Sequence, residues 1–332
     1  MLDWPKLSSV PPPTAPARFS HKNICFLSLA SRTIFSMTEK DLHLVPGTLQ
    51  TTLLERAANA SRCGAIHSLP TTMEVIEQDG IPFQVRILQP LATNARTKAT
   101  ASDVDPFLQY NPELFVAPIS PTHIALLNTF NVLEHHLLIV TRAFENQQCQ
   151  LTQQDCEALL IGLTEIDGLA FYNAGRDAGA SQPHKHFQLI PFNPAIAPLP
   201  IDPLLLFPQA DSMVDTVPGL PFRHVGAPMD PDWTNPEKHS GASLHASYRK
   251  LLRAAGLSVD PTVGSHMPTA PYNLLVTRKW ILLVPRSQEC FEGISINALG
   301  FAGMLLVKSE QQLARLRRFG PVTALQQVTT PS

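Results

Sequence analysis

The stretch Asn173-Ala-Gly-Arg-Asp-Ala-Gly-Ala-Ser-Gln-Pro-His-Lys-His-Phe-Gln188 ends in three polar residues spaced two apart, His184, His186 and Gln188. The run His-Lys-His-Phe-Gln-Leu-Ile predicts a β-strand, in which successive side chains point to opposite faces of the sheet. We therefore expect His184, His186 and Gln188 on one face and the residues between them on the other.

A loop of small and polar residues precedes this row and contains Gly175, Gly179, Ser181 and Gln182. Backbone N–H groups in such a loop can surround an anion, and a neighbouring imidazole can attack a phosphate ester. A surface histidine pair or a partial metal site would explain the histidines alone. The loop favours the phosphate chemistry, because its small and polar residues would contribute little to a hydrophobic core.

Length and composition describe a folded, soluble protein. The 332 residues suffice for one large domain or two medium ones. A net charge of −2 gives no overall attraction to nucleic acid or to an anionic membrane, and no stretch approaches the roughly 20 apolar residues of a membrane span. The five cysteines are scattered without a C-x-x-C pair, so no zinc site or disulfide framework is expected and the predicted location is cytoplasmic.

Residues 1–37 differ in composition from the rest of the chain. They contain Pro11-Pro12-Pro13, several serines and several basic residues, and Asp3 is the only acidic residue before Glu39. This composition is typical of a transit peptide. We favour the simpler interpretation of a disordered tail, or of a start assigned too early with true initiation at Met37.

Apolar periodicity from residue 48 onward predicts regular elements. Helices are expected over 48–61, from a capping box at Thr152–Asp155 to about Asp167, over 243–255 and near 309–319. Strands are expected over 72–77, 81–88, 123–128, 136–141, 272–277 and 280–286, residues 169–173 are expected to lead into the glycine loop, and residues 194–236 are expected to be irregular. The strand pairs in 125–142 and 273–286 resemble each other, which suggests two related half-units, although coincidence between apolar strands is an equally fair explanation.

Several motifs resemble the ATP adenylyltransferases, also called diadenosine tetraphosphate phosphorylases, of the histidine-triad superfamily. They are Gly80-Ile-Pro-Phe-Gln-Val-Arg86, Leu126-Leu-Asn-Thr-Phe-Asn131, His136-Leu-Leu-Ile-Val-Thr141, Phe171-Tyr-Asn-Ala-Gly175, Gly179-Ala-Ser-Gln-Pro-His-Lys-His186, Pro271-Tyr-Asn-Leu-Leu274 and Val284-Pro-Arg286. The combination is specific and runs from about residue 50 to the C-terminus.

The resemblance implies an α+β fold, a histidine-triad-like antiparallel sheet with flanking helices. It also implies a nucleotidyltransferase domain with the catalytic strand over 38–240, followed by the C-terminal part of the adenylyltransferase domain over 241–332. The implied reaction is reversible: diadenosine tetraphosphate and phosphate give ATP and ADP. The implied catalytic residues are His186 as nucleophile, which carries a covalent adenylyl group, with His184 and Gln188.

Gln188 stands where hydrolytic members of the superfamily carry a third histidine. An amide can hydrogen-bond a phosphoryl oxygen but cannot transfer a proton at neutral pH. We hypothesise that Gln188 favours transfer to phosphate over hydrolysis to AMP. The resemblance implies further substrate-binding residues, which are Lys98, Asn128, Thr129, Asn173, Gly179, Ala180, Ser181, Gln182, Asn273 and Arg278.

Some of these assignments stay open. Lys98 is equally well explained as a solvated linker lysine, and Arg286 either completes the site or pairs with a buried carboxylate. Relatives commonly have Asn-Lys-Phe where this chain has Asn128-Thr129-Phe130, so a cation is missing from the polyphosphate path. The pair His135-His136 is interpreted as the start of a strand.

Rival functions remain at this level. Sulfate in place of phosphate would make the protein an ADP sulfurylase, and sugar-nucleotide phosphorolysis or non-catalytic nucleotide binding are further alternatives. Mg²⁺ is expected as the nucleotide complex, with no protein metal site. The expected partners are nucleotides and phosphate, not nucleic acid or membrane, and the sequence leaves the oligomeric state and the purine preference open.

Overall fold

The computed structural model describes residues 42–89, 105–205, 207, 216–230, 232, 241–257 and 270–331. The predicted N-terminal extension over 1–37 and the segment that contains Lys98 lie outside these residues. Residues 37–332 form one compact unit. The predicted boundary at 240/241 stays a prediction.

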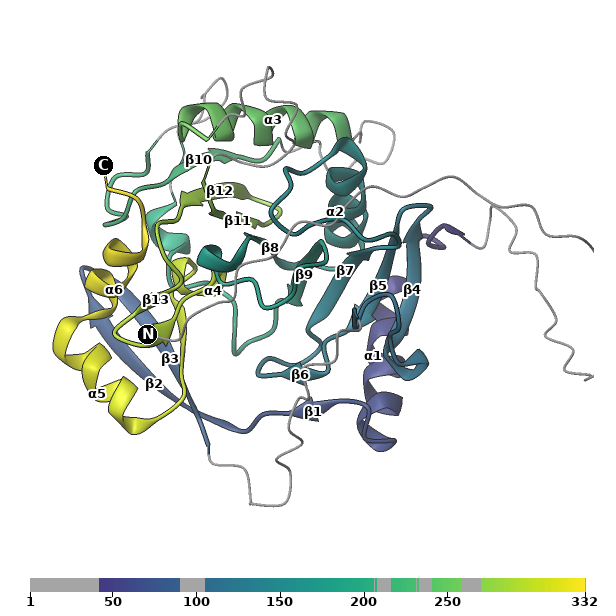
Figure 1. Ribbon diagram of the computed structural model, residues 1–332, viewed down its shortest axis with the longest axis horizontal. Coiled ribbons are helices and arrows are strands. Elements are labelled where there is room, and N and C mark those ends of the chain that lie inside the picture. The colour runs from purple at the N-terminus through teal and green to yellow at the C-terminus, as the bar shows by residue number, and fades with distance from the viewer. Residues whose placement is uncertain are drawn as a thin grey trace, which may run out of the picture. The chain divides into compact units, whose positions relative to one another are not determined.

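A central sheet of eight strands, each antiparallel to its neighbours, organises the fold (Figure 1). Its order is β10 (Val225–Pro228), β12 (Trp280–Pro285), β11 (Tyr272–Val276), β8 (Gly168–Ala174), β9 (His186–Pro191), β7 (Leu137–Thr141), β5 (His123–Leu127) and β4 (Phe115–Ser120). Every residue of β5, β7, β8, β11 and β12 is buried, so both faces of the sheet are covered. This confirms the predicted α+β class with an antiparallel sheet.

Three helices cover the first face of the sheet: α1 (Leu49–Arg62), α2 (Gln153–Glu165) and α3 (Gly241–Ala254). They pack on alternate strand residues such as Tyr172, Phe187 and Leu189. The predicted capping box opens α2, because Thr152 accepts from the Asp155 N–H and Asp155 accepts from the Thr152 N–H.

The second face is covered in two parts. The intervening strand residues, among them Phe171 and Ile190, pack against a three-stranded sheet of β2 (Thr71–Gln78), β3 (Ile81–Leu88) and β15 (Met304–Val307), and against α4 (Ala298–Phe301), α5 (Glu310–Phe319) and α6 (Pro321–Val328). At the β5–β7 end, a separate apolar cluster packs against the segment 107–115. The candidate site lies between these two parts.

The hairpin β5–β7 adjoins β9, and the hairpin β11–β12 adjoins β8 on the other side of the sheet centre. The short strands are β1 (His67–Ser68) with β6 (Phe130–Asn131), and β13 (Cys290–Phe291) with β14 (Ile294–Ser295). Sequence periodicity did not predict β4, β10, α6 or the short strands. Short 3₁₀ turns lie at Pro112–Leu114, Arg176–Ala178 and Asp202–Leu204.

Candidate active site

The two faces predicted for the histidine row are present. Gln188 and Ile190 point to the second face of the sheet, while Phe187 packs on the first face. Lys185 is directed to α2, where its ammonium donates to Asp155 Oδ2 at 3.0 Å. The strand begins at His186, and His184 precedes it in an isolated bridge to Asn146.

The backbone of His186 is held by the side chain of Gln147. Gln147 Oε1 accepts from the His186 N–H at 2.8 Å, and Gln147 Nε2 donates to the His186 carbonyl at 3.2 Å and to the Asn173 carbonyl at 3.0 Å. This amide therefore satisfies backbone groups at the point where the ladder starts. No local sequence signal distinguishes Gln147 from its neighbour Gln148.

Hydrogen bonding fixes which nitrogen of His186 is free. Its Nδ1 lies 2.8 Å from the His184 carbonyl oxygen, so Nδ1 carries the proton and Nε2 keeps its lone pair. Burial lowers the pKa of His186 to about 4, partly offset by the bond to the His184 carbonyl, and the His184 ring lowers it further. His186 is therefore neutral at pH 7, as a nitrogen nucleophile must be.

His186 opens into a cavity of about 340 Å³, the first cavity, whose walls come from the segment 106–110, β5, β7 and the end of the glycine loop. Its lining combines apolar and aromatic side chains with hydroxyl and amide groups. The lining residues are Pro106, Phe107, Tyr110, Leu114, Leu126, Leu127, Asn128, Thr129, Phe130, Leu138, Ser181, Gln182, His186 and Gln188.

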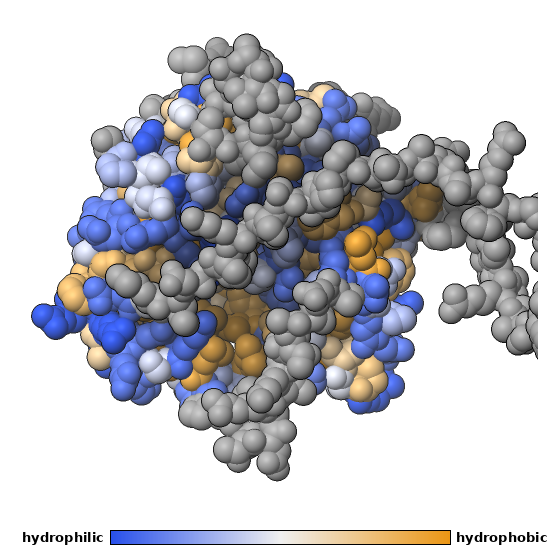
Figure 2. All heavy atoms as spheres, in the orientation of Figure 1, coloured by the Kyte–Doolittle hydropathy of each residue, from blue (hydrophilic) through white to orange (hydrophobic). Residues whose placement is uncertain are grey.

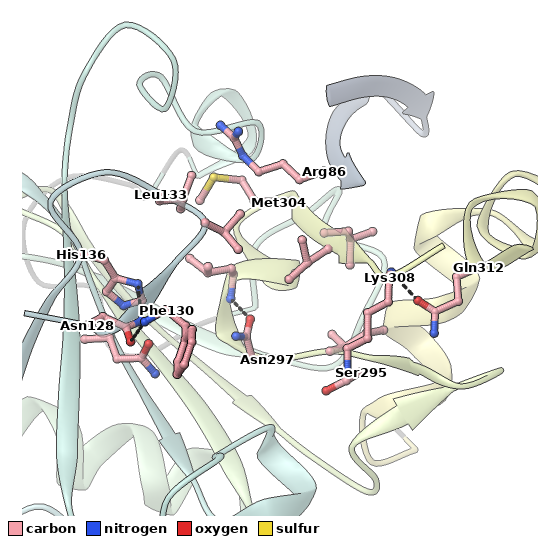
Figure 3. A pocket seen from close by; sticks show the side chains of 17 residues that line it. Arg86, Asn128, Phe130, Leu133, His136, Ser295, Asn297, Met304, Lys308 and Gln312 are labelled. Carbon is pink, nitrogen blue, oxygen red and sulfur yellow. Dashed lines mark hydrogen bonds between the residues drawn. The ribbon is translucent and has the colours of Figure 1, made fainter. Parts of the chain in front are cut away.

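A second cavity of about 250 Å³ shares Asn128, Phe130 and Gln188 with the first. Figure 3 shows Asn128, His136 and Phe130 on one side and Lys308, Gln312 and Ser295 on the other. In Figure 2, hydrophobic side chains gather in a hollow between the β2–β3 side and the β6 side of the same face. The other lining residues are Arg86, Val132, Leu133, Ile296, Asn297, Leu299, Gly300, Met304, Leu305 and Leu306.

His136 lines the second cavity and contacts Asn128, which lines both. Asn128 Nδ2 donates to His136 Nδ1 at 3.2 Å, which leaves the proton on Nε2. Among the residues that the structure describes, this buried Nε2 has no hydrogen-bond partner. Burial lowers the pKa of His136 to about 4, the nearby Gln188 side chain raises it in part, and the nearby His186 ring lowers it. A neutral donor thus lines the second cavity at a position that the sequence marked only as a strand start.

The glycine loop reaches the first cavity through only part of its length. Ser181 and Gln182 line the cavity, whereas Gly179 and Ala180 do not. Gly179 has φ +88°, and a Cβ added there would lie 2.8 Å from Asn297 Cβ and 2.9 Å from Asn297 Cα. Glycine is therefore required by the backbone conformation and by the close approach to Asn297.

Asn173 and Asn273 lie opposite each other on β8 and β11 and are buried. Asn273 Nδ2 donates to Asn173 Oδ1 and to the Ala178 carbonyl, both at 2.8 Å, and Asn273 Oδ1 accepts from Arg286 at 2.6 Å. These bonds hold the glycine loop from behind. Arg286 also donates to backbone carbonyls, including that of Val328, so its partners in the described part of the chain are carbonyls and an amide, where the sequence had suggested a buried carboxylate.

Arg278 lies at the C-terminal end of α2 and lines neither cavity. It donates to the carbonyls of Leu163 and Thr164 at 2.9 Å and lies 3.5 Å from Asp167 Oδ1. The structure thus brings His186, Gln188, Asn128, Thr129, Ser181 and Gln182 together at the first cavity. Direct nucleotide contact by Asn173, Gly179, Ala180, Asn273 and Arg278 stays a prediction, as does that of Lys98.

An antiparallel sheet with a histidine motif at a cavity between two covering layers defines a protein of the histidine-triad type. Two family models match consecutive parts of the chain: "Ap4A phosphorylase N-terminal domain" over residues 39–207 and "ATP adenylyltransferase C-terminal domain" over residues 218–331, where Ap4A is diadenosine tetraphosphate. The chain belongs to this ATP adenylyltransferase (Ap4A phosphorylase) family, and it is an enzyme, a nucleotidyltransferase.

Relatives in Saccharomyces cerevisiae agree with this assignment. Diadenosine 5′,5‴-P1,P4-tetraphosphate phosphorylase 2 is 30% identical over 250 residues, which cover 68% of this chain and 75% of that protein. Protein APA1 is 26% identical over 270 residues, 74% of this chain and 82% of that protein. The crystal structure of the yeast Ap4A phosphorylase Apa2 superposes with a TM-score of 0.68 at 26% identity, over 87% of this chain and 96% of that one.

Within the described ranges, no helix is long and apolar enough to cross a bilayer. No group of three or more histidine, cysteine or acidic side chains in those ranges is arranged to hold a metal ion.

Proposed function

We propose that this enzyme is a diadenosine tetraphosphate phosphorylase that works through an adenylyl group carried on His186. The observation that carries the proposal is the neutral His186 ring, whose Nδ1 is bonded to the His184 carbonyl while Nε2 faces the first cavity. The yeast relative that is 30% identical is named for this activity, which supports the same substrate here.

The chemistry proceeds in two displacements. The Nε2 lone pair attacks the α-phosphorus of one adenylyl end, the P–O bond to the leaving chain breaks, and ATP departs. A phosphate oxygen then attacks the same phosphorus, the P–N bond breaks, and ADP departs while the ring nitrogen regains its lone pair. ATP is a good leaving group without protonation, so the amide of Gln188 suffices where an acid would otherwise be needed.

The two cavities offer room for both ends of such a substrate. We assign the adenosine of the attacked end to the first cavity, beside Phe107 and Tyr110. The leaving nucleotide extends past Gln188 into the second cavity, toward Lys308. Lys308 supplies a cation for the polyphosphate in a chain that has Thr129 where relatives carry a lysine. Mg²⁺ would arrive with the nucleotide and neutralise part of the phosphate charge.

The decisive experiment supplies the purified protein with diadenosine tetraphosphate and phosphate. Equal amounts of ATP and ADP are expected, and AMP as the main product would contradict the proposal. Repeating the reaction with sulfate tests the sulfurylase alternative, since adenylyl sulfate would appear in place of ADP.

The covalent step has its own test. Intact-mass measurement after mixing with diadenosine tetraphosphate, without phosphate, should show one added adenylyl group that is absent from His186→Ala. Turnover by His186→Ala would overturn the mechanism. His43→Ala serves as a control, because His43 is exposed and lines neither cavity.

A further inference from the structure

The ring of His184 is fully buried behind His186, and both of its nitrogens have partners. Nε2 lies 2.8 Å from the Thr141 carbonyl oxygen and 2.9 Å from the Thr141 hydroxyl. That hydroxyl donates to the Lys185 carbonyl, so its oxygen can accept from His184. Nδ1 lies 2.7 Å from Asp105 Oδ2. Both nitrogens of this ring therefore face acceptors.

Two acceptors require two protons on the His184 ring. The Thr141 carbonyl has no proton to give, so Nε2 must carry one. Nδ1 lies 2.7 Å from a carboxylate oxygen and carries the second proton, which it donates to Asp105. The Asp105 side chain also keeps 18% of its surface exposed, and water stabilises the carboxylate.

Asp105 uses its other carboxylate oxygen to shape the backbone that follows. Oδ1 accepts from the Phe107 N–H at 2.8 Å and from the Leu108 N–H at 3.4 Å. One carboxylate thus joins the turn of the segment 106–110 to the histidine strand. Pro106, Phe107 and Tyr110 of this segment line the first cavity.

Phe107 brings that wall against the nucleophile. Its ring centroid lies 5.0 Å from that of His186 and 5.6 Å from that of His184, the latter in an edge-to-face arrangement. The Phe144 ring meets His184 edge-to-face at 5.4 Å. Lys185, the nearest cation along the chain, is engaged on the opposite face with Glu145 and Asp155.

We propose that Asp105 is a positioning residue: its carboxylate pairs with a His184 imidazolium and pins the 106–110 wall of the first cavity against the His186 ring. Asp105 does not line either cavity, so it acts through the wall and not by touching the nucleotide. That the cavity binds an adenine nucleotide rests on the proposed function, whereas the pairing of Asp105 with His184 is independent of it.

Loss of this anchor should weaken nucleotide binding more than it slows the chemistry. Charge-assisted hydrogen bonds are roughly twice as strong as neutral ones. Removing one should raise the KM for diadenosine tetraphosphate about tenfold in Asp105→Ala, with a smaller rise in Asp105→Asn, whose amide can still bond Nδ1. The kcat should change less than about threefold, because the His184 carbonyl still accepts from His186.

A double-mutant cycle separates positioning from a general structural role. Asp105→Ala, Phe107→Ala and the double variant are compared by KM and kcat. If Asp105 acts through the wall, the double variant should be no worse than the poorer single variant. Rises in KM that multiply to about a hundredfold would overturn the proposal. Glu113→Gln removes an exposed carboxylate a few residues further along and should leave KM unchanged.

The protonation of His184 is tested on the free protein by ¹⁵N NMR of the imidazole groups at pH 7.5, with signals assigned from His184→Gln. Both ring nitrogens should carry protons in the wild type, and only Nε2 in Asp105→Asn. A singly protonated wild-type ring would overturn the pairing. If the enzyme proves inactive on diadenosine tetraphosphate, the proposed function fails, whereas this spectrum and AMP affinities measured by calorimetry still decide the role of Asp105.

Discussion

At the scale of single residues, burial decides the protonation state of the site. The rings of His186 and His136 have pKa values of about 4, and desolvation is the largest cause for both. Each therefore stays neutral from pH 8 down to about pH 5. One acts as the candidate nucleophile and the other presents an N–H donor.

The same pKa values predict how stability depends on pH. Between pH 6.5 and 4 the unfolded chain binds protons at these histidines, whereas the folded protein does not. These two histidines should therefore make the free energy of unfolding fall as the pH drops from 6.5 to 4, by about 3 kcal/mol for each. Urea unfolding at a series of pH values measures this. His67→Asn, at an exposed position, should keep the full fall, while His136→Asn should reduce the fall by about 3 kcal/mol.

Gln188 should control which acceptor resolves the adenylyl enzyme. Gln188→His would place a group able to accept a proton from water beside His186, and general-base catalysis contributes roughly 10²–10⁴-fold. We expect the ratio of AMP to ADP released from diadenosine tetraphosphate to rise at least about tenfold at equal phosphate. Chromatography of the products measures the ratio. Gln188→Asn, which keeps the amide, should leave it low; an unchanged ratio in Gln188→His would contradict the role of the amide.

At the scale of elements, the glycine loop requires glycine at position 179 for two reasons, the positive φ of the backbone and the close approach of Asn297. Gly64, after α1, has φ +77° and open space around a would-be Cβ, whereas Gly179 has φ +88° and meets Asn297. Gly64→Ala should cost only the backbone term, about 1 kcal/mol. Gly179→Ala should cost more and also reduce kcat/KM, because Ser181 and Gln182 follow it. Thermal melts and initial rates compare the two variants. An equal loss of stability in both would show that the close approach of Asn297 does not require glycine at position 179.

Element positions were predictable where the pattern is local. Alternation in the histidine strand correctly predicted the shared face of His186 and Gln188, and the capping box located the start of α2. Asp105, Gln147 and Lys308 could not be found in this way. Their positions depend on contacts between segments far apart in the chain, and nothing in their neighbouring residues signals those contacts.

Asn173 and Asn273 show that a residue in a recognised motif can have a structural role where the sequence predicts ligand binding. Both stand in motifs shared with the family, yet in the structure each is bonded to the other beneath the glycine loop. A motif preserves residues that hold a loop in place as well as residues that contact a ligand. Sequence alone does not separate the two.

At the scale of the whole molecule, one sheet spans the ranges matched by both family models. Strand β8 pairs with β11 across a gap of about 100 residues in sequence, and α3 covers the first face. A fragment of residues 38–240 would leave β8 without its neighbour β11 on one edge and remove part of the apolar cluster that covers Phe171. We expect this fragment to show no cooperative thermal unfolding, whereas residues 37–332 should melt in one transition. A fragment that melts cooperatively and binds AMP would contradict this view and support an independent domain.

The position of β9 has a consequence for how substrate enters and leaves. From Gln188 onward β9 pairs with β7 and β8 along both edges, and His186 itself pairs with Val140 of β7 and is joined to Asn173 of β8 through the Gln147 side chain. Phe130 is half exposed between the two cavities, and the segment 106–110 forms one wall of the first cavity. Access to the nucleophile therefore depends on the side chains that enclose it, while the histidine itself is held by the backbone of the sheet.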